Sequence, residues 1–134
     1  MEIRLLKEGD YKNILTKWWL AWRFTPPPKE NLPDNGLGGF MVFKNDVDIC
    51  AGFLYQTNSK TAWCEFIVSN NEYRDKEGRR EALELLINAF SHTAKKQGYT
   101  NIYTSLTHPS LKKAYKNCGY VTGSEKCTEM IKKL

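Results

Sequence analysis

Basic side chains gather around a glycine between an apolar stretch and a long amphipathic stretch of the chain. Arg74, Lys76, Arg79 and Arg80 flank Gly78, and glycine permits close approach of the backbone. The first turn of a helix exposes unpaired N–H groups and carries a partial positive charge, and guanidinium groups pair with phosphate oxygens. A strand that leads into such a turn builds an anion site, usually for phosphate. The alternative interpretation is a solvated helix start of mixed charge.

An acidic residue within the apolar stretch is the candidate for proton transfer. Glu65 lies inside the segment TAWCEFIVS. A carboxylate on a central strand is costly unless it is paired or used, and burial would raise its pKa toward the range that suits a general base. We therefore consider Glu65 a candidate base, against the alternative that it faces solvent or forms a salt bridge.

These residues require a strand, a turn and a helix in succession. Positions 61–69 have the composition of a strand, and the helix that follows ends at Gly98, where a C′ glycine is typical. Positions 101–106 return as a strand, so the unit is predicted to be a parallel crossover. One apolar stripe of the helix should be buried: Leu83, Leu86, Ile87, Phe90 and Ala94.

The N-terminal region is predicted to contain a strand and a helix. Positions 1–7 alternate as a short strand, and Asp10 is a candidate N-cap for a helix in YKNILTKWWLAWRF. Packing against a sheet explains the tryptophans of this helix. The alternative is that aromatic residues here line a substrate pocket, for which Trp18, Trp22 and Phe24 are the candidates.

The remaining segments complete one α/β domain spanning residues 1–134. Positions 25–39 are rich in proline and glycine and should form an irregular loop, either functional or a plain connection. Positions 40–43, 47–55 and 61–69 should form an antiparallel meander. A short helix at 111–118, closed by Gly119, and a last strand near 127–132 give the order β-α-β-β-β-α-β-α-β.

Composition excludes several classes of protein. The 134 residues are 41% hydrophobic, which suits one packed core, and no apolar run approaches the roughly 20 residues that span a bilayer. The N-terminus lacks the continuous apolar core of a signal peptide, so we expect a cytoplasmic protein. The cysteines show no CxxC pair, so reduced thiols and no metal site are expected.

The charge is uneven along the chain. From position 94 onward eight lysines face two glutamates, a net charge of +6, whereas the remainder has twelve basic and thirteen acidic residues. A basic C-terminal third suggests an anionic partner, which could be a nucleotide cofactor, a nucleic acid or an acidic surface.

At this point the chain resembles the GNAT superfamily of acyl-CoA-dependent N-acetyltransferases. The family's pyrophosphate motif [QR]-x-x-G-x-[GA] matches D-K-E-G-R-R-E-A-L, with Gly78 in register but Asp75 and Arg80 at the outer positions. The family's motif Y-x-x-x-G-[FY] matches Tyr115 through Tyr120. The element order agrees over nearly the whole chain, so the resemblance implies a mixed, mostly antiparallel sheet of about six or seven strands flanked by helices.

The resemblance implies a reaction and a set of residues. Acetyl-CoA would be the co-substrate and a primary amine, on a small molecule, a protein lysine or an N-terminus, the acceptor. Tyr115 would protonate the leaving thiolate, with a structural core tyrosine as the alternative, and Glu65 would serve as base. The residues expected to hold acetyl-CoA are Ile67, Val68, Lys76, Gly78, Arg79, Arg80 and His108.

Two other functions compete with an active enzyme. The irregular phosphate motif and the basic C-terminal third would also suit a catalytically degenerate protein that binds a protein or CoA. Nucleic-acid binding is less favoured, because no RNP-like or helix-turn-helix pattern is present. The expected assembly is a monomer or a homodimer, since an exposed last strand could pair between subunits.

Overall fold

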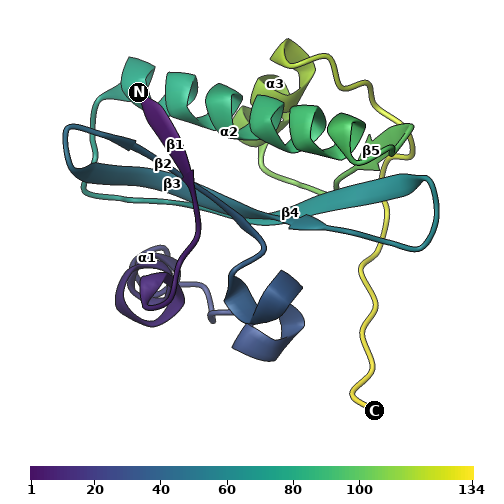
Figure 1. The fold of residues 1–134 in the computed structure, drawn as a ribbon, viewed down its shortest axis with the longest axis horizontal. Coiled ribbons are helices and arrows are strands. Elements are labelled where there is room, and N and C mark those ends of the chain that lie inside the picture. Colours follow the sequence, from purple (N-terminus) through teal and green to yellow (C-terminus); the bar gives the residue numbers. More distant parts are fainter.

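A five-stranded mixed sheet forms the centre of the molecule in the computed structural model, which describes all 134 residues (Figure 1). The strands lie in the order in which they occur in the chain, and only the last pair is parallel. The strands are β1 (Glu2–Leu5), β2 (Gly39–Lys44), β3 (Val47–Tyr55), β4 (Thr61–Ser69) and β5 (Asn101–Tyr103).

Helices cover both faces of this sheet (Figure 1). One face carries α2 and α3, and we call it the α2 face; the other carries α1 and the short helical turns, and we call it the α1 face. No helix has the length and apolarity needed to cross a membrane. The helical elements are η1 (Tyr11–Leu15), α1 (Thr16–Ala21), η2 (Lys29–Asn31), η3 (Pro33–Gly36), α2 (Lys76–Lys96) and α3 (Pro109–Asn117).

The predicted meander of β2, β3 and β4 is confirmed. Lys44 and Val47 are paired, so the β2–β3 turn contains only Asn45 and Asp46, whose φ angles are 49° and 65°. Two central residues with positive φ make a type I′ turn, whose twist matches that of the flanking strands. The local sequence therefore fixes this turn, and the register of the hairpin shifts once, between Val42 and Phe43.

A β-bulge interrupts β4 at its centre. Phe53 pairs with Glu65 and Ala51 pairs with Val68, so two residues of β4 oppose the single residue Gly52. The extra residue is Phe66, whose φ of 59° is unusual for an aromatic side chain. A Cβ at position 52 would lie 2.8 Å from the ring of Phe90, so glycine is required for α2 to pack closely over the bulge.

Helix α2 confirms the predicted crossover, because β4 and β5 are parallel and α2 connects them. Its apolar stripe is buried against the α2 face at Ala82, Leu86, Ile87, Phe90 and Ala94. Gly98 has a φ of 92° and its N–H donates to the Lys95 carbonyl, which ends the helix as the sequence predicts.

Asp10 precedes the first helical turn as expected, but its side chain does not cap that turn. Its buried carboxylate accepts hydrogen bonds from both terminal nitrogens of Arg4, at 2.8 and 3.2 Å, and from the Lys7 N–H at 2.8 Å. The guanidinium of Arg4 reaches the carboxylate from β1, so this ion pair joins the first strand to the first helix.

Replacing Asp10 with alanine is expected to lower the free energy of unfolding by about 2 kcal/mol. The change leaves the partly buried Arg4 guanidinium and the Lys7 N–H without their hydrogen-bond acceptor. Urea unfolding monitored by circular dichroism measures the change. Glu8→Ala, at an exposed neighbouring position, is the matched control and should shift stability by less than about 0.5 kcal/mol. Equal effects of both substitutions would contradict a structural role for the ion pair.

The predicted last strand is absent, so the sheet has five strands and not six or seven. Residues 121–134 are exposed and form no regular element, and β5 ends at Tyr103, three residues earlier than predicted. The sequence CTEMIK places apolar residues at 127, 130 and 131 and an acid at 129. That spacing does not put apolar side chains on one face of a strand, which requires a period of two.

Candidate functional site

The outer edge of β4 is unpaired after its short pairing with β5, and we call this unpaired edge, from Cys64 to Ser69, the slot. The two strands pair only through Thr61, Ala62 and Trp63, after which the chain that follows β5 diverges toward α3. Beyond Trp63, no strand lies along the outer edge of β4. Ile67 and Val68, which the sequence analysis assigns to cofactor binding, belong to this unpaired stretch. An extended ligand can pair with such an edge as an additional strand.

Glu65 lies at the start of this slot. Its Oε1 accepts a hydrogen bond of 2.8 Å from the Ser105 N–H, which links β4 to the segment after β5. Burial raises the pKa of the half-buried Glu65 carboxyl, the Ser105 N–H lowers it, and the Glu129 carboxylate raises it further. The net result is a raised pKa, so Glu65 holds its proton to higher pH than a free glutamate does.

Two pairs of aromatic rings lie near Glu65 on the α1 face, and we call them the aromatic face: Tyr55, Trp63, Phe66 and Tyr103. Trp63 packs against Tyr103 with ring centroids 5.3 Å apart, and Tyr55 packs against Phe66 at 6.4 Å. Trp63, Phe66 and Tyr103 remain between 37% and 54% exposed. Trp63 shares the face of Glu65 because strand residues two apart point to the same side.

Asp75 occupies the first turn of α2, where the sequence predicts an anion site. As the N-cap of α2 it accepts a hydrogen bond of 3.1 Å from the Gly78 N–H to its Oδ1. Gly78 is buried, and a Cβ there would lie 2.6 Å from the Tyr73 hydroxyl oxygen and 2.7 Å from Asp75 Oδ2. A phosphate that binds this amide must therefore displace the Asp75 carboxylate.

Arg79 and Trp22 are brought together at this end of β4. The Arg79 guanidinium carbon lies 5.4 Å from the centre of the Trp22 ring, which is within cation–π range. The Trp22 Nε1–H donates to the Ser69 carbonyl at 2.7 Å, so the end of α1 is joined to the end of β4. Lys76 and Arg80 are exposed on the same turn of α2. These contacts make the turn a basic border of the slot.

Tyr115 lies on the opposite face of β4 from Glu65. Its ring is buried, its hydroxyl is 3.5 Å from the Cys64 thiol, and its edge packs on the Tyr120 ring at 4.8 Å. Burial, together with the neighbouring thiol, raises the pKa of Tyr115 far above its ordinary value. Tyr115 is therefore neutral and protonated at all ordinary pH values, as an acid must be before it reacts.

The remaining predicted residues lie outside this cluster. Trp18 is buried in the α1-face core, whereas Phe24, which follows α1, is exposed. His108 is exposed and occupies the N-cap position of α3 without a capping hydrogen bond. The sequence analysis missed Ser105 and the aromatic face. Alternation along β4 places Trp63 beside Glu65, but only the bulge turns Phe66 toward Tyr55.

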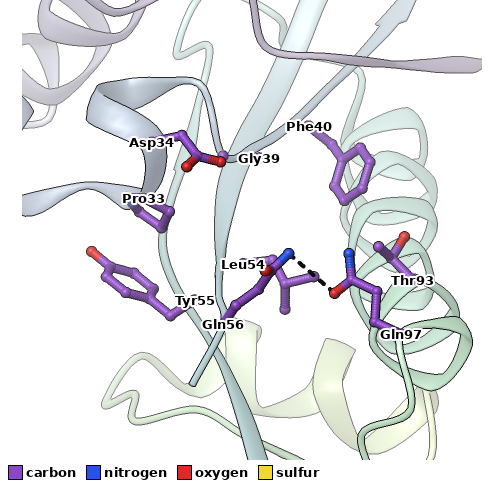
Figure 2. Close-up of a pocket in the computed structure, with 10 residues that line it drawn as sticks. Pro33, Asp34, Gly39, Phe40, Leu54, Tyr55, Gln56, Thr93 and Gln97 are labelled. Carbon is purple, nitrogen blue, oxygen red and sulfur yellow. Dashed lines mark hydrogen bonds between the residues drawn. The ribbon is translucent and has the colours of Figure 1, made fainter. Parts of the chain in front are cut away.

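A separate cleft of about 280 Å³ lies at the other end of α2 (Figure 2). Tyr55 and Pro33 border it, and a hydrogen bond of 3.2 Å joins Gln56 to Gln97 across it. Its α2 residues begin at Thr93, fifteen positions after Gly78, which corresponds to roughly 22 Å along a helix. This cleft therefore does not adjoin the basic turn.

Searches by sequence find no matching family model and no matching curated protein. Solved structures do match over nearly the whole chain. An acetyltransferase from Trypanosoma brucei aligns with a TM-score of 0.64 at 15% identity, covering 97% of this chain and 99% of that one. Glucosamine-6-phosphate N-acetyltransferase from Arabidopsis thaliana aligns with a TM-score of 0.64 at 13% identity, covering 98% of each chain.

A third similar structure is named differently. It is a transcriptional regulator from Bacillus halodurans C-125, with a TM-score of 0.68 at 13% identity, and the alignment covers 97% of this chain and 99% of that one. The predicted resemblance is confirmed at the level of structure: this chain has the GNAT fold. Identities this low establish the fold alone.

Proposed function

We propose that the protein is an N-acetyltransferase that transfers the acetyl group of acetyl-CoA to a primary amine. The observation that carries the proposal is the slot beside β4, which has a basic helix start at one end and a half-buried carboxylate at the other. The GNAT fold, which named acetyltransferases share, supports it.

The residues around the slot fit an acyl-CoA with one departure. Arg79, Arg80 and Lys76 supply positive charge for the diphosphate, and the free edge of β4 near Val68 suits the amide-bearing pantetheine arm. The departure is Asp75, whose carboxylate already accepts the Gly78 N–H. We propose that Asp75 turns aside when the diphosphate binds, which weakens binding without preventing it.

Two residues of the chain then accept and donate the protons of the reaction. The acceptor amine must be neutral to attack the thioester, so Glu65 takes its proton, directly or through a water molecule. The new C–N bond forms as the C–S bond breaks. Tyr115 gives its hydroxyl proton to the departing thiolate and later regains one from solvent. The products are an N-acetyl amine and free CoA.

A second candidate is a GNAT-fold binding protein without catalytic activity. It is favoured by one observation, the Asp75 carboxylate on the helix amide where a phosphate would bind. Similarity to a chain named as a transcriptional regulator is compatible with this alternative.

Thermal unfolding with and without acetyl-CoA, followed by a thiol-release assay on a panel of primary amines, tests the proposal. A ligand that binds only the folded chain adds about 2.7 kcal/mol at a hundred times its dissociation constant, which raises Tm by several degrees. Arg79→Ala should reduce the shift. A shift without thiol release from any amine would favour a binding protein that retains the CoA site. No shift at saturating acetyl-CoA would contradict the acetyltransferase and would favour a binding protein whose phosphate site is closed by Asp75.

Replacing Tyr115 with phenylalanine is expected to lower kcat about tenfold. The usual effect of a general acid is larger, but a thiol with a pKa near ~8.5 leaves with little assistance. Steady-state thiol release measures the change. Tyr120→Phe is the matched control, because the Tyr120 hydroxyl contacts the same Cys64 thiol at 3.9 Å. Equal losses in both variants would indicate that Tyr115 has only a structural role.

A further inference from the structure

The aromatic face recognises one kind of amine best. A carboxylate flanked by exposed ring faces binds an ammonium group through charge and cation–π attraction, and the rings cover an aliphatic stem. Glu65 supplies the carboxylate, and Trp63, Phe66 and Tyr103 supply exposed aromatic surface around it. A lysine side chain has both parts, a compact ammonium and a four-carbon stem.

The surface is also open to a long acceptor. The described cleft of about 280 Å³ lies beyond Tyr55, whereas the aromatic rings around Glu65 are partly exposed to solvent. A small molecule would gain few enclosing contacts there. A lysine carried by an extended segment of chain gains contacts along its flanking residues as well.

The C-terminal tail, residues 121–134, has the properties of such a segment. No backbone hydrogen bond involves any residue after Tyr120, and all fourteen tail residues are exposed. Figure 1 shows the tail leaving α3 on the α2 face and extending to the side of the sheet on which α1 lies. Met130 and Ile131 are 89% and 88% exposed, so this free segment also presents apolar side chains.

The tail passes on the side of the sheet toward which Glu65 points (Figure 1). The Glu129 carboxylate is close enough to Glu65 to raise its pKa. Lys126 and Lys132 each lie three residues from Glu129, about 10 Å along an extended chain, and Lys133 follows directly. A shift of the tail by about 10 Å along its own direction would replace Glu129, a like charge, with a lysine ammonium near the Glu65 carboxylate.

We propose that the acceptor of this site is a lysine of an extended segment, and that the protein's own tail, at Lys126, Lys132 or Lys133, is its tethered acceptor. This inference rests on the proposed acetyl transfer. The tether gives the tail lysines an effective concentration on the order of millimolar, so they react before dilute external lysines do.

The modification balances as a simple acyl transfer from acetyl-CoA. Glu65 removes a proton from the lysine ammonium, and the neutral ε-nitrogen forms a bond to the acetyl carbon. The C–S bond breaks, and the thiolate takes a proton from Tyr115. The tail gains an acetyl amide and loses one positive charge, so it also loses its attraction to Glu65 and leaves the aromatic face free.

The first test is acetylation of the full chain, followed by peptide mass spectrometry. With acetyl-CoA present, a tail lysine should be acetylated at least about tenfold faster than Lys12 or Lys44, which lie elsewhere on the surface. The rate constant should not change with protein concentration, because the reaction is intramolecular. Glu65→Gln should slow the tail reaction and leave the slow background at Lys44 unchanged.

A free amine separates this inference from the proposed function. Nα-acetyl-lysine methyl ester, added at millimolar concentration, serves as the probe. If it is acetylated in a Glu65-dependent manner while the tail is not, the tail inference is wrong and the acetyltransferase stands. If neither reacts, the inference of a lysine acceptor is wrong, and thiol release with the panel of other primary amines decides whether the protein is an acetyltransferase. A chain with Lys126, Lys132 and Lys133 changed to arginine should still acetylate the probe, with Lys44→Arg as the matched control.

A second readout needs no acetyl-CoA. A carbodiimide joins a carboxylate to a lysine amine that touches it, so the unliganded protein should give an isopeptide cross-link between Glu65 and a tail lysine. Glu65→Gln should abolish that cross-link, and the three arginine substitutions should abolish it too. The absence of any tail cross-link to Glu65 in the unmodified chain would overturn the proposal.

Discussion

Replacing Glu65 with glutamine is expected to lower the rate of acetyl transfer about 10³-fold at neutral pH, the middle of the range for a general base. Glutamine has nearly the same shape, and its Oε1 can still accept the 2.8 Å hydrogen bond from the Ser105 N–H. The fold and the slot should therefore remain, while the group that removes a proton from the amine is lost. Thiol release at saturating acetyl-CoA measures the change.

The pH dependence supplies an independent check. The pKa of Glu65 is raised, chiefly by burial, so kcat/KM for the unmodified protein should fall as pH drops through that raised value. The Glu65→Gln variant should lack this limb. Glu30→Gln, at an exposed position on η2, is the control and should keep both rate and profile. A Glu65→Gln enzyme with the original profile would show that another group is the base.

The raised pKa of Glu65 also makes the stability of the fold depend on pH. Because the folded pKa of Glu65 lies above the unfolded one, folding takes up a proton between the two values. The free energy of unfolding should therefore fall as pH rises through that window, and Glu65→Gln should remove this part of the dependence. Urea unfolding across the window measures it.

Replacing Asp75 with glycine is expected to tighten acetyl-CoA binding roughly 30-fold, which corresponds to about 2 kcal/mol. The substitution frees the Gly78 N–H for phosphate and removes a negative charge that a diphosphate would meet at close range, although solvent screens part of that repulsion. Glycine is tolerated at an N-cap, so the stability cost should be a few tenths of a kcal/mol. Titration calorimetry measures the affinity.

Asp75→Asn separates the two causes. Asparagine can still accept the Gly78 N–H but carries no charge, so its affinity should lie between those of the unmodified chain and Asp75→Gly. If Asp75→Gly binds acetyl-CoA no more tightly than the unmodified chain, the diphosphate does not use the α2 amides, and the basic side chains around Arg79 would have to bind it alone.

Local sequence patterns predicted most of the fold. The apolar run of β3, the apolar stripe of α2 and the glycine at position 98 each specify a structure within a few residues. The prediction of a final strand was wrong because the apolar residues near 127–131 do not follow the period of two that a strand requires, and no partner edge pairs with this segment. The capping role predicted for Asp10 was wrong for a related reason. Its carboxylate pairs with Arg4 of β1, and N-cap propensity alone does not predict this contact.

The candidate site could be predicted only in part. The sequence placed Glu65 on a strand and Gly78 at a helix start, and the structure has both there. The surroundings depend on tertiary contacts. The hydrogen bond from Ser105 joins residues forty positions apart, and the Trp22–Arg79 contact joins the first helix to the second. The hydrogen bond from the Gly78 N–H to Asp75 depends on a side-chain conformation that the sequence motif does not specify.

Because of the extra residue Phe66, a deletion at the bulge and a deletion elsewhere in β4 have different effects on the fold. On either side of Phe66 the strand alternates correctly, and the alternation stays in phase with the core only because that one residue lies outside the pairing with β3. Loss or gain of a residue elsewhere in β4 would turn every following side chain to the wrong face. At this position a deletion would restore a regular ladder, so the surface beside Glu65 can change length in evolution while the core packing is kept.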